Sequence, residues 1–236
     1  MPFVNAASHS FFPGRRPGTI YNPNVLPNLQ IWYNADVGAP PNFNQTYTSG
    51  NDISQWTDRS ATGHNANQSG NNTVKPNWYS NVQNGYGAVR FNGTSESLNI
   101  NPVAATPEWI VGVSAWTAYM VFKMSSTTGT RPLLDTDVPL VGPKIYYNGT
   151  NWCVGASGGV GTSSIAGDTT GFHYISLIYD GTATGNANRL KMRFDNQPVT
   201  LNFGATTVGS SIATGAKYLY WATDATNFYA GDLAEV

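Results

Sequence analysis

The sequence predicts an all-β fold built from layered sheets, and three observations lead to this prediction. From Arg189 to Phe194, cationic and apolar residues alternate strictly, which is the period of a strand with one buried face. The preceding run, His173 to Tyr179, is apolar on both sides of the pleat, as in a strand covered on two faces. Asp180-Gly181 then supplies a tight-turn dipeptide. A half-buried strand beside a covered one indicates a β-sandwich and excludes a helical or Rossmann-like fold.

Strand-like runs separated by turn signals continue from Leu29 to the end of the chain, and helical periodicity is absent. Asn84-Gly85, Asn92-Gly93 and Asn148-Gly149 lie between runs and are strong turn markers. The segment Ser157–Thr170 is rich in Gly, Ser and Thr and is expected to be a mobile loop. The other expected strands are LQIWYN (29–34), ISQW (53–56), AVRF (88–91), SLNI (97–100), WTAYMVFK (116–123), KIYY (144–147), NWCVGA (151–156), KYLYW (217–221) and NFYAGDLAEV (227–236).

Composition narrows the class of protein. The chain has 236 residues, of which only 11% are charged, so amides and hydroxyls must keep it in solution, as on many extracellular and virion surfaces. A net charge of -1 gives no general attraction for nucleic acid or anionic lipid, and no run is apolar enough to span a membrane. The N-terminal segment lacks the apolar core of a secretory signal. Cys153, the only cysteine, is expected to be inert.

Residues 1–27 form an expected N-terminal arm, because five prolines interrupt regular strand pairing there. Its apolar side chains need burial, and its two arginines could pair with acidic groups. The arm either folds back on its own domain or docks on a partner. The anchoring residues predicted in it are Phe3, Phe11, Phe12, Arg15, Arg16 and Tyr21.

The order of segments resembles the concanavalin A-like lectin/glucanase sandwich, in its laminin-G-like branch found in phage and bacterial surface proteins. LQIWYNADVG is similar to that family's opening strand, and ISQWTDRSATGHNANQ resembles its W-x-D-x-S-G loop, with Ala61 in place of the glycine. KPNWYSNVQNGYGAVRFNGTSESLNI resembles a Pro-aromatic turn followed by a strand ending in R-F-x-G. WTAYMVFKM, FHYISLIYDG and FYAGDLAEV match later landmarks, so the likeness runs from about Leu29 to Val236.

This resemblance implies a two-sheet antiparallel jelly roll over residues 28–236, with ligands at a loop rim or in a concave groove. It does not imply catalysis, because one fold hosts many functions. The family usually continues its last strand for a few apolar residues beyond the point that corresponds to Val236. A natural chain that follows the family would therefore be longer than this sequence.

No catalytic constellation stands out. Enzymes of the superfamily carry E-x-D-x-x-E on one strand, and Asp232 with Glu235 comes closest, at a spacing that places the two on opposite faces. His9, His64 and His173 have no nucleophile motif beside them, and His64 is expected to be a turn residue bonded to backbone. We therefore expect no enzyme.

No obligatory metal or other cofactor is expected. Asp135 and Asp137 are weak candidates for Ca²⁺, weighed against a solvated turn before Pro139.

Exposed aromatic rings on a β-sandwich are platforms for sugars, and aromatic residues make up 13% of this chain. Trp109 in a loop, and Tyr147 with Asn148 at a turn, are the glycan-binding candidates. Trp32, Trp56, Trp78, Trp116 and Trp221 are expected in the core. Arg189, Lys191 and Arg193 form a cationic row, interpreted as a solvated face that blocks edge aggregation, or as a docking surface for an acidic partner.

Together these observations favour a non-enzymatic virion structural or display protein of a bacteriophage: a head fibre, a decoration protein or a tail fibre component. The arm would bind capsid or tail proteins, and a homo-oligomer on the virion surface would bind host-surface glycans weakly and polyvalently. No nucleic acid and no membrane insertion are expected. The alternative is a carbohydrate-binding module of a secreted or cell-surface bacterial protein, and the less favoured third is a polysaccharide hydrolase or lyase.

Overall fold

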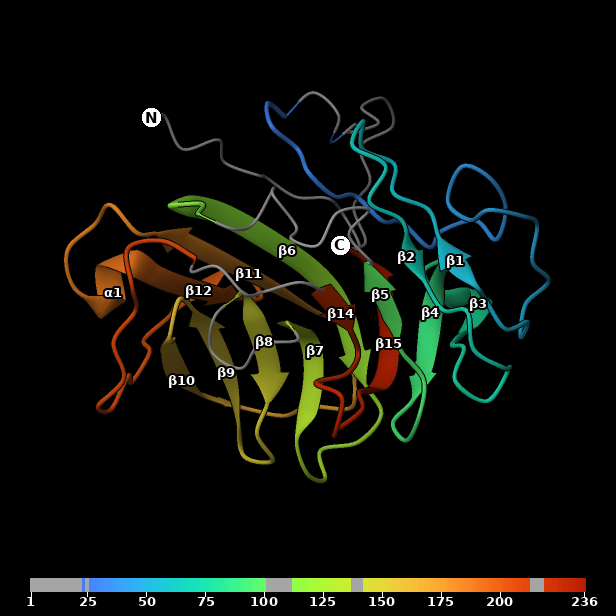
Figure 1. Ribbon diagram of the computed structural model, residues 1–236. Coiled ribbons are helices and arrows are strands. Elements are labelled where there is room, and N and C mark those ends of the chain that lie inside the picture. The colour runs from blue at the N-terminus through green and yellow to red at the C-terminus, as the bar shows by residue number, and fades with distance from the viewer. Residues whose placement is uncertain (1–22, 24–25, 101–111, 137–141, 213–218) are drawn as a thin grey trace.

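A computed structural model describes residues 23, 26–100, 112–136, 142–212 and 219–236. They form a sandwich of two antiparallel sheets, stacked face to face (Figure 1). The predicted all-β sandwich is therefore confirmed. Residues 1–22, 24 and 25, which include every predicted anchoring residue of the arm, lie outside the described part, as do Trp109 and Asp137. Within the described part, no helix has the length and hydropathy needed to cross a membrane.

The eight-stranded sheet has the order β1-β2-β5-β14-β7-β8-β9-β10. Its strands span β1 Gln55–Trp56, β2 Ala66–Asn67, β5 Leu98–Ile100, β14 Leu219–Trp221, β7 Arg131–Thr136, β8 Lys144–Tyr147, β9 Asn151–Ala156 and β10 Gly159–Ala166. The seven-stranded sheet has the order β13-β12-β11-β6-β15-β4-β3. Its strands span β13 Gln197–Val199, β12 Leu190–Phe194, β11 His173–Asp180, β6 Ala115–Met124, β15 Ala230–Glu235, β4 Tyr86–Asn92 and β3 Asn77–Gln83.

The core lies between the sheets and is rich in aromatic rings. Phe122 of β6 packs on Trp152 of β9 with ring centroids 4.8 Å apart, which joins one sheet to the other. Of the five tryptophans expected in the core, four are buried and Trp116 is half-buried against Tyr179. Cys153 is buried in β9.

The alternation in β12 follows the sequence prediction. Leu190, Met192 and Phe194 are buried, and Lys191 and Arg193 are exposed. Arg189 departs from it, because this residue ends the single helical turn α1, Asn186–Arg189, and donates to the carbonyls of Ala183 and Val208. The cationic row therefore has two strand members.

Three further predictions need correction. Ser157–Thr170 is not a loop throughout, because β10 pairs with β9 along the edge of the sheet. The segment LQIWYN has no regular ladder; its main chain exchanges hydrogen bonds between Tyr33 and Val236 and bridges Asn34 to Glu235. Strand β11 is only partly covered on its outer side, where Tyr174 and Ile178 are half-buried.

Asp58, in the W-x-D-x-S loop, organises the connection between β1 and β2. Its carboxylate accepts hydrogen bonds from the backbone N–H groups of Trp32, Ser60 and His64. His64 enters this network through its own backbone, because its carbonyl also accepts the hydroxyl of Tyr33. Partial burial lowers the pKa of His64.

Candidate functional site

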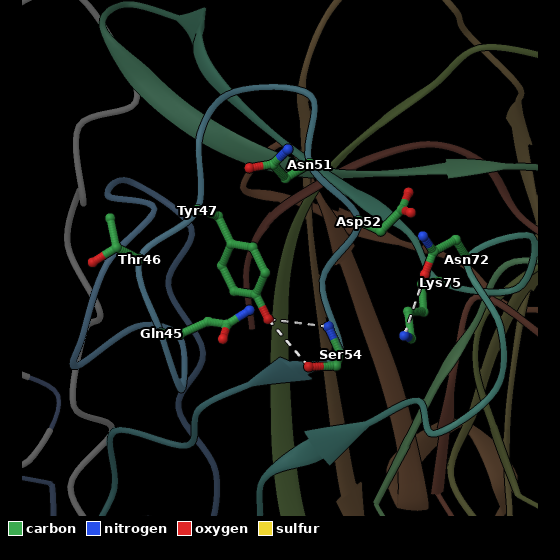
Figure 2. Close-up of a pocket in the computed structure, with 8 residues that line it drawn as sticks. All are labelled: Gln45, Thr46, Tyr47, Asn51, Asp52, Ser54, Asn72 and Lys75. Atoms are coloured by element: carbon green, nitrogen blue, oxygen red, sulfur yellow. Dashed lines mark hydrogen bonds between the residues drawn. The ribbon is translucent and has the colours of Figure 1, made fainter.

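Two polar clefts open on the surface of the sandwich. The first, here called the Tyr47 cleft, is lined by residues of the segment 45–54 together with Asn72 and Lys75, and has a volume of about 340 Å³ (Figure 2). The second, the Arg131 cleft, is lined by segments 93–94, 128–131 and 226–228 and has a volume of about 330 Å³. Both volumes lie near the lower end of the range for small-molecule sites.

Aromatic packing holds the Tyr47 cleft in place. Phe43 is buried and packs edge-on against Tyr47, with ring centroids 5.6 Å apart, and stacks on Trp56 of β1. Trp78 of β3 closes the cluster and donates from its indole nitrogen to the carbonyl of Ala35 at 2.8 Å. A loop without regular secondary structure is therefore fixed by its buried rings rather than by a ladder.

Hydrogen bonds fix several groups at the cleft. The Tyr47 hydroxyl lies 2.9 Å from Asn44 Oδ1 and accepts the backbone N–H of Ser54 at 3.2 Å. Asp52 accepts the side-chain amide of Asn77 at 2.7 Å. In the view of Figure 2, Tyr47 lies between Gln45 and Asn51. The cleft is thus a preformed concave surface.

The exposed side chains of the cleft are mostly uncharged. Gln45, Asn51 and Asn72 carry amides, which both donate and accept hydrogen bonds. Asp52 and Lys75 are half-buried and add one acceptor and one donor of opposite charge. Such a set suits a neutral ligand with many hydroxyl groups and offers little to an apolar one.

The charge of Asp52 in this cleft affects the pKa of a buried carboxyl group, that of Glu96. Glu96 is buried, and its Oε2 accepts the backbone N–H of Asn92 at 2.7 Å. Burial, with a smaller contribution from the charge of Asp52, raises the pKa of Glu96 to about 7 against the hydrogen bond from Asn92. Glu96 therefore carries a proton part of the time near neutral pH.

The Arg131 cleft has its guanidinium engaged. Arg131 Nη1 donates to the carbonyl oxygens of Gly93 at 3.1 Å and Phe228 at 2.9 Å. The side chain thereby joins the loops that precede β5 and β15, which is a structural role. The half-buried ring of Phe228 also lies at this cleft.

The two described residues of the predicted glycan-binding set, Tyr147 and Asn148, differ in exposure. Tyr147 is buried, with 4% of its surface exposed, and packs on Trp152, so its prediction as an exposed sugar platform is wrong. Its β-strand position points it into the core, whereas Asn148 is exposed at the β8–β9 turn. Asn148 Oδ1 accepts the N–H groups of Thr150 and Asn151, which is a turn-forming role.

Asp232 and Glu235 lie on the same face of β15, contrary to the prediction from their spacing. Asp232 is opposite Lys123 and Glu235 opposite Val121, because a bulge between Leu233 and Glu235 adds a residue to the strand. Asp232 is bound by Arg90, and Glu235 accepts the indole N–H of Trp32 at 3.0 Å. Burial raises the pKa of Glu235. Each carboxylate therefore has a partner within the fold.

Asp135, the described member of the predicted calcium pair, has a lysine as its counter-charge. Lys144 Nζ lies 2.8 Å from Asp135 Oδ2, and both side chains are largely buried. Among the described residues, no group of three or more His, Cys, Asp or Glu side chains is arranged to hold a metal ion. The calcium site stays a prediction.

The chain matches no protein-family model. A search of curated proteins also finds no match.

Solved structures give distant likenesses. A sialidase of Trypanosoma rangeli is 14% identical with a TM-score of 0.49; the match covers 89% of this chain and 30% of the sialidase. The CBM40 domain of a Ruminococcus gnavus IT-sialidase is 9% identical with a TM-score of 0.44; the match covers 63% of this chain and 86% of that domain. The receptor-binding domain of a botulinum neurotoxin of C/D mosaic serotype is 9% identical with a TM-score of 0.47; the match covers 87% of this chain and 47% of the toxin domain. This chain thus spans less than a third of the sialidase, and its β-sandwich class rests on its own strand order and register.

Proposed function

We propose that this chain is a non-enzymatic carbohydrate-binding β-sandwich whose ligand enters the Tyr47 cleft. The observation that carries the proposal is the set of exposed amides on Gln45, Asn51 and Asn72 around a preformed cavity of about 340 Å³. Sugar hydroxyls donate and accept hydrogen bonds, as these amides do. The Arg131 cleft is less suited, because its guanidinium already binds two backbone carbonyls.

The carboxyl groups at the cleft support the proposal of binding without turnover. A glycosidase places two carboxyl groups on either side of the scissile bond. Asp52 alone among the eight residues that line the Tyr47 cleft carries a carboxylate. Glu96 is buried and bonded to the backbone of Asn92, so it does not flank a ligand there.

A glycan array followed by calorimetry with the full chain tests the binding site. Gln45→Ala with Asn72→Ala should weaken the best glycan about thirtyfold, since each change removes a hydrogen bond of about 1 kcal/mol. Gln197→Ala is the matched control, because Gln197 is an exposed residue of β13, at the edge of its sheet opposite to β3. An equal loss of affinity in Gln197→Ala and in the Gln45→Ala, Asn72→Ala variant would contradict the proposed site.

The absence of turnover is tested on the same glycan. Prolonged incubation should release no new reducing ends. Release that disappears in Asp52→Asn would instead make the chain a hydrolase.

We also propose that the sandwich is displayed as a homo-oligomer on a bacteriophage particle, as a head fibre, decoration or tail fibre component, with residues 1–27 as its anchor. The uncharged polar surface supports display, and weak sites repeated on a particle gain avidity. Removing residues 1–27 should abolish incorporation while the melting temperature is unchanged. Normal incorporation would refute the anchor, and tight binding of one sugar by the monomer would favour a module of a bacterial cell-surface protein.

A further inference from the structure

Two tyrosines form a parallel pair on the seven-stranded sheet. The rings of Tyr119 in β6 and Tyr174 in β11 lie with centroids 6.1 Å apart and planes 5° apart. Both side chains lie on the outer side of the sheet, since the next residues, Met120 and Ile175, are buried in the core. Tyr119 is 38% exposed and Tyr174 is half-buried. The pair therefore presents aromatic surface away from the core.

Two cations of β12 lie beside this pair on the same face. Across the sheet, Tyr119 is opposite Ser176, and Ser176 is opposite Arg193 of β12. Neighbouring strands are about 4.8 Å apart, so the backbone of Arg193 lies about 10 Å from that of Tyr119. Lys191 is two residues from Arg193 on the same exposed side. This group of four residues is here called the tyrosine face.

The carbonyl of Asn196 orients one of the cations. Arg193 donates to this oxygen from Nε at 3.2 Å and from Nη2 at 2.8 Å, at the turn between β12 and β13. The remaining N–H groups of a guanidinium form a fixed fork that fits a carboxylate. Arg193 is thus held in place with donors to spare.

The carboxylates around the tyrosines are engaged within the fold: Asp195, at the turn after β12, accepts the backbone N–H of Tyr174 at 2.9 Å and lies 2.8 Å from His173 Nδ1. Asp180 accepts hydrogen bonds from Thr182, and its pKa is lowered mainly by these bonds and least by the charge of Lys191. Asp232, farther along the same face, is neutralised by Arg90. Lys191 and Arg193 therefore lie next to an aromatic platform whose neighbouring carboxylates already have partners within the fold.

We propose that the tyrosine face binds a strand of an acidic polysaccharide, apart from any ligand of the Tyr47 cleft. Sugar rings pack their C–H faces on Tyr119 and Tyr174, and carboxylates along the chain pair with Lys191 and Arg193. An open sheet suits a polymer that runs across strands better than a single small ring. The ligand class is a uronic acid polymer.

Single-stranded nucleic acid also binds aromatic rings and cations on sheets. It carries one negative charge per nucleotide and needs a groove of cations that follows its backbone. The tyrosine face, as defined by its four residues, has two cations and no line of cations for a backbone of phosphates, which favours the polysaccharide.

Titration of the full chain with polygalacturonate oligomers, and with the same oligomers as methyl esters, tests this proposal. Esterification removes the charge and keeps the rings, so the ester should bind about tenfold more weakly. Tyr119→Ala and Tyr174→Ala should each weaken both forms about three- to tenfold. Lys191→Gln with Arg193→Gln should weaken the acid form only and flatten its salt dependence.

Lys75→Gln is the matched control, because Lys75 lines the Tyr47 cleft and not the tyrosine face. This variant and the Gln45→Ala, Asn72→Ala pair should leave polygalacturonate binding unchanged, which separates this proposal from the proposed function. Near-ultraviolet circular dichroism checks the fold of each variant. Failure of polygalacturonate to bind, equal binding of its ester, an equal loss in Lys75→Gln, or tighter binding of oligothymidylate would each overturn the proposal.

Discussion

Arg90 of β4 and Asp232 of β15 form a bidentate ion pair across neighbouring strands, with Nε–Oδ1 at 2.7 Å and Nη2–Oδ2 at 3.0 Å. The two side chains differ in burial: Asp232 is 7% exposed and Arg90 is 47% exposed. The cost of breaking the pair should therefore depend on which partner is removed.

Arg90→Ala should lower the free energy of unfolding by about 2–3 kcal/mol, because it leaves a buried carboxylate without its donor. Asp232→Ala should cost about 1 kcal/mol, since the arginine head can turn to water. The double variant should cost less than the sum of the two. Urea unfolding measures all three, and equal costs for the single variants would show that burial does not set the asymmetry.

Glu96 should make stability fall between about pH 4.5 and pH 7. Its pKa is raised to about 7, mainly by burial, so the folded state holds a proton that the unfolded state releases nearer 4.5. The stabilising contribution is complete below the unfolded pKa and is lost as pH rises through 7. Glu96→Gln keeps an acceptor for Asn92 and should exceed the parent by about 1 kcal/mol at pH 8. Parallel stability curves against pH would disprove this account.

His173 should also make the free energy of unfolding fall as pH rises, over a range that begins near pH 6.5. Its Nδ1 lies 2.8 Å from Asp195 Oδ2 and its Nε2 3.2 Å from Asp168 Oδ2, and the hydrogen bond to Asp195 is the largest cause of a raised pKa. The stabilisation is present below about pH 6.5 and is lost as pH rises through the raised value. Thermal melting of His173→Gln should show a deficit at pH 6 that shrinks by pH 9. A constant deficit would mean that packing on Phe122 and Phe194, not charge, is what the variant loses.

Gly87 should couple the sheet to the Tyr47 cleft. A Cβ added there would lie 2.1 Å from the carbonyl oxygen of Ala35 and 2.7 Å from Trp78 Nε1, the two groups that share a hydrogen bond. Gly87→Ala should cost about 2 kcal/mol or more, because backbone must shift. It should also weaken glycan binding, as Trp78 supports Phe43 beneath the cleft. Gly171→Ala, at a position with open space around it and no positive φ, is the comparison for which glycan binding should not change.

Much of the fold can be predicted from the period of the sequence. Strand β12 follows its alternation because one side meets the core and the other meets water. Strand β10 cannot be recognised that way, because its small residues resemble a loop. Its glycines serve close packing: a Cβ on Gly159 would lie 2.5 Å from the side chain of Val208. Composition alone does not distinguish a mobile segment from a tightly packed edge.

Less of the candidate site can be predicted. The residues of the Tyr47 cleft carry no motif, and they meet only because Phe43 is buried against Trp56 and Trp78. Asp232 and Glu235 share a face through a bulge, which the strand period does not reveal. The exposure of Tyr119 in the tyrosine face could have been predicted from the sequence, because Tyr119 falls on the outward positions of an alternating strand.

The most direct test of the central claim, that the Tyr47 cleft is a carbohydrate site without catalysis, is a titration of the ¹⁵N-labelled chain with the best glycan from an array. The account predicts that the amide signals of Gln45, Asn51 and Asn72 shift with a single dissociation constant while the glycan stays intact. Unmoved signals at these residues, with shifts elsewhere or with cleavage of the glycan, would contradict it.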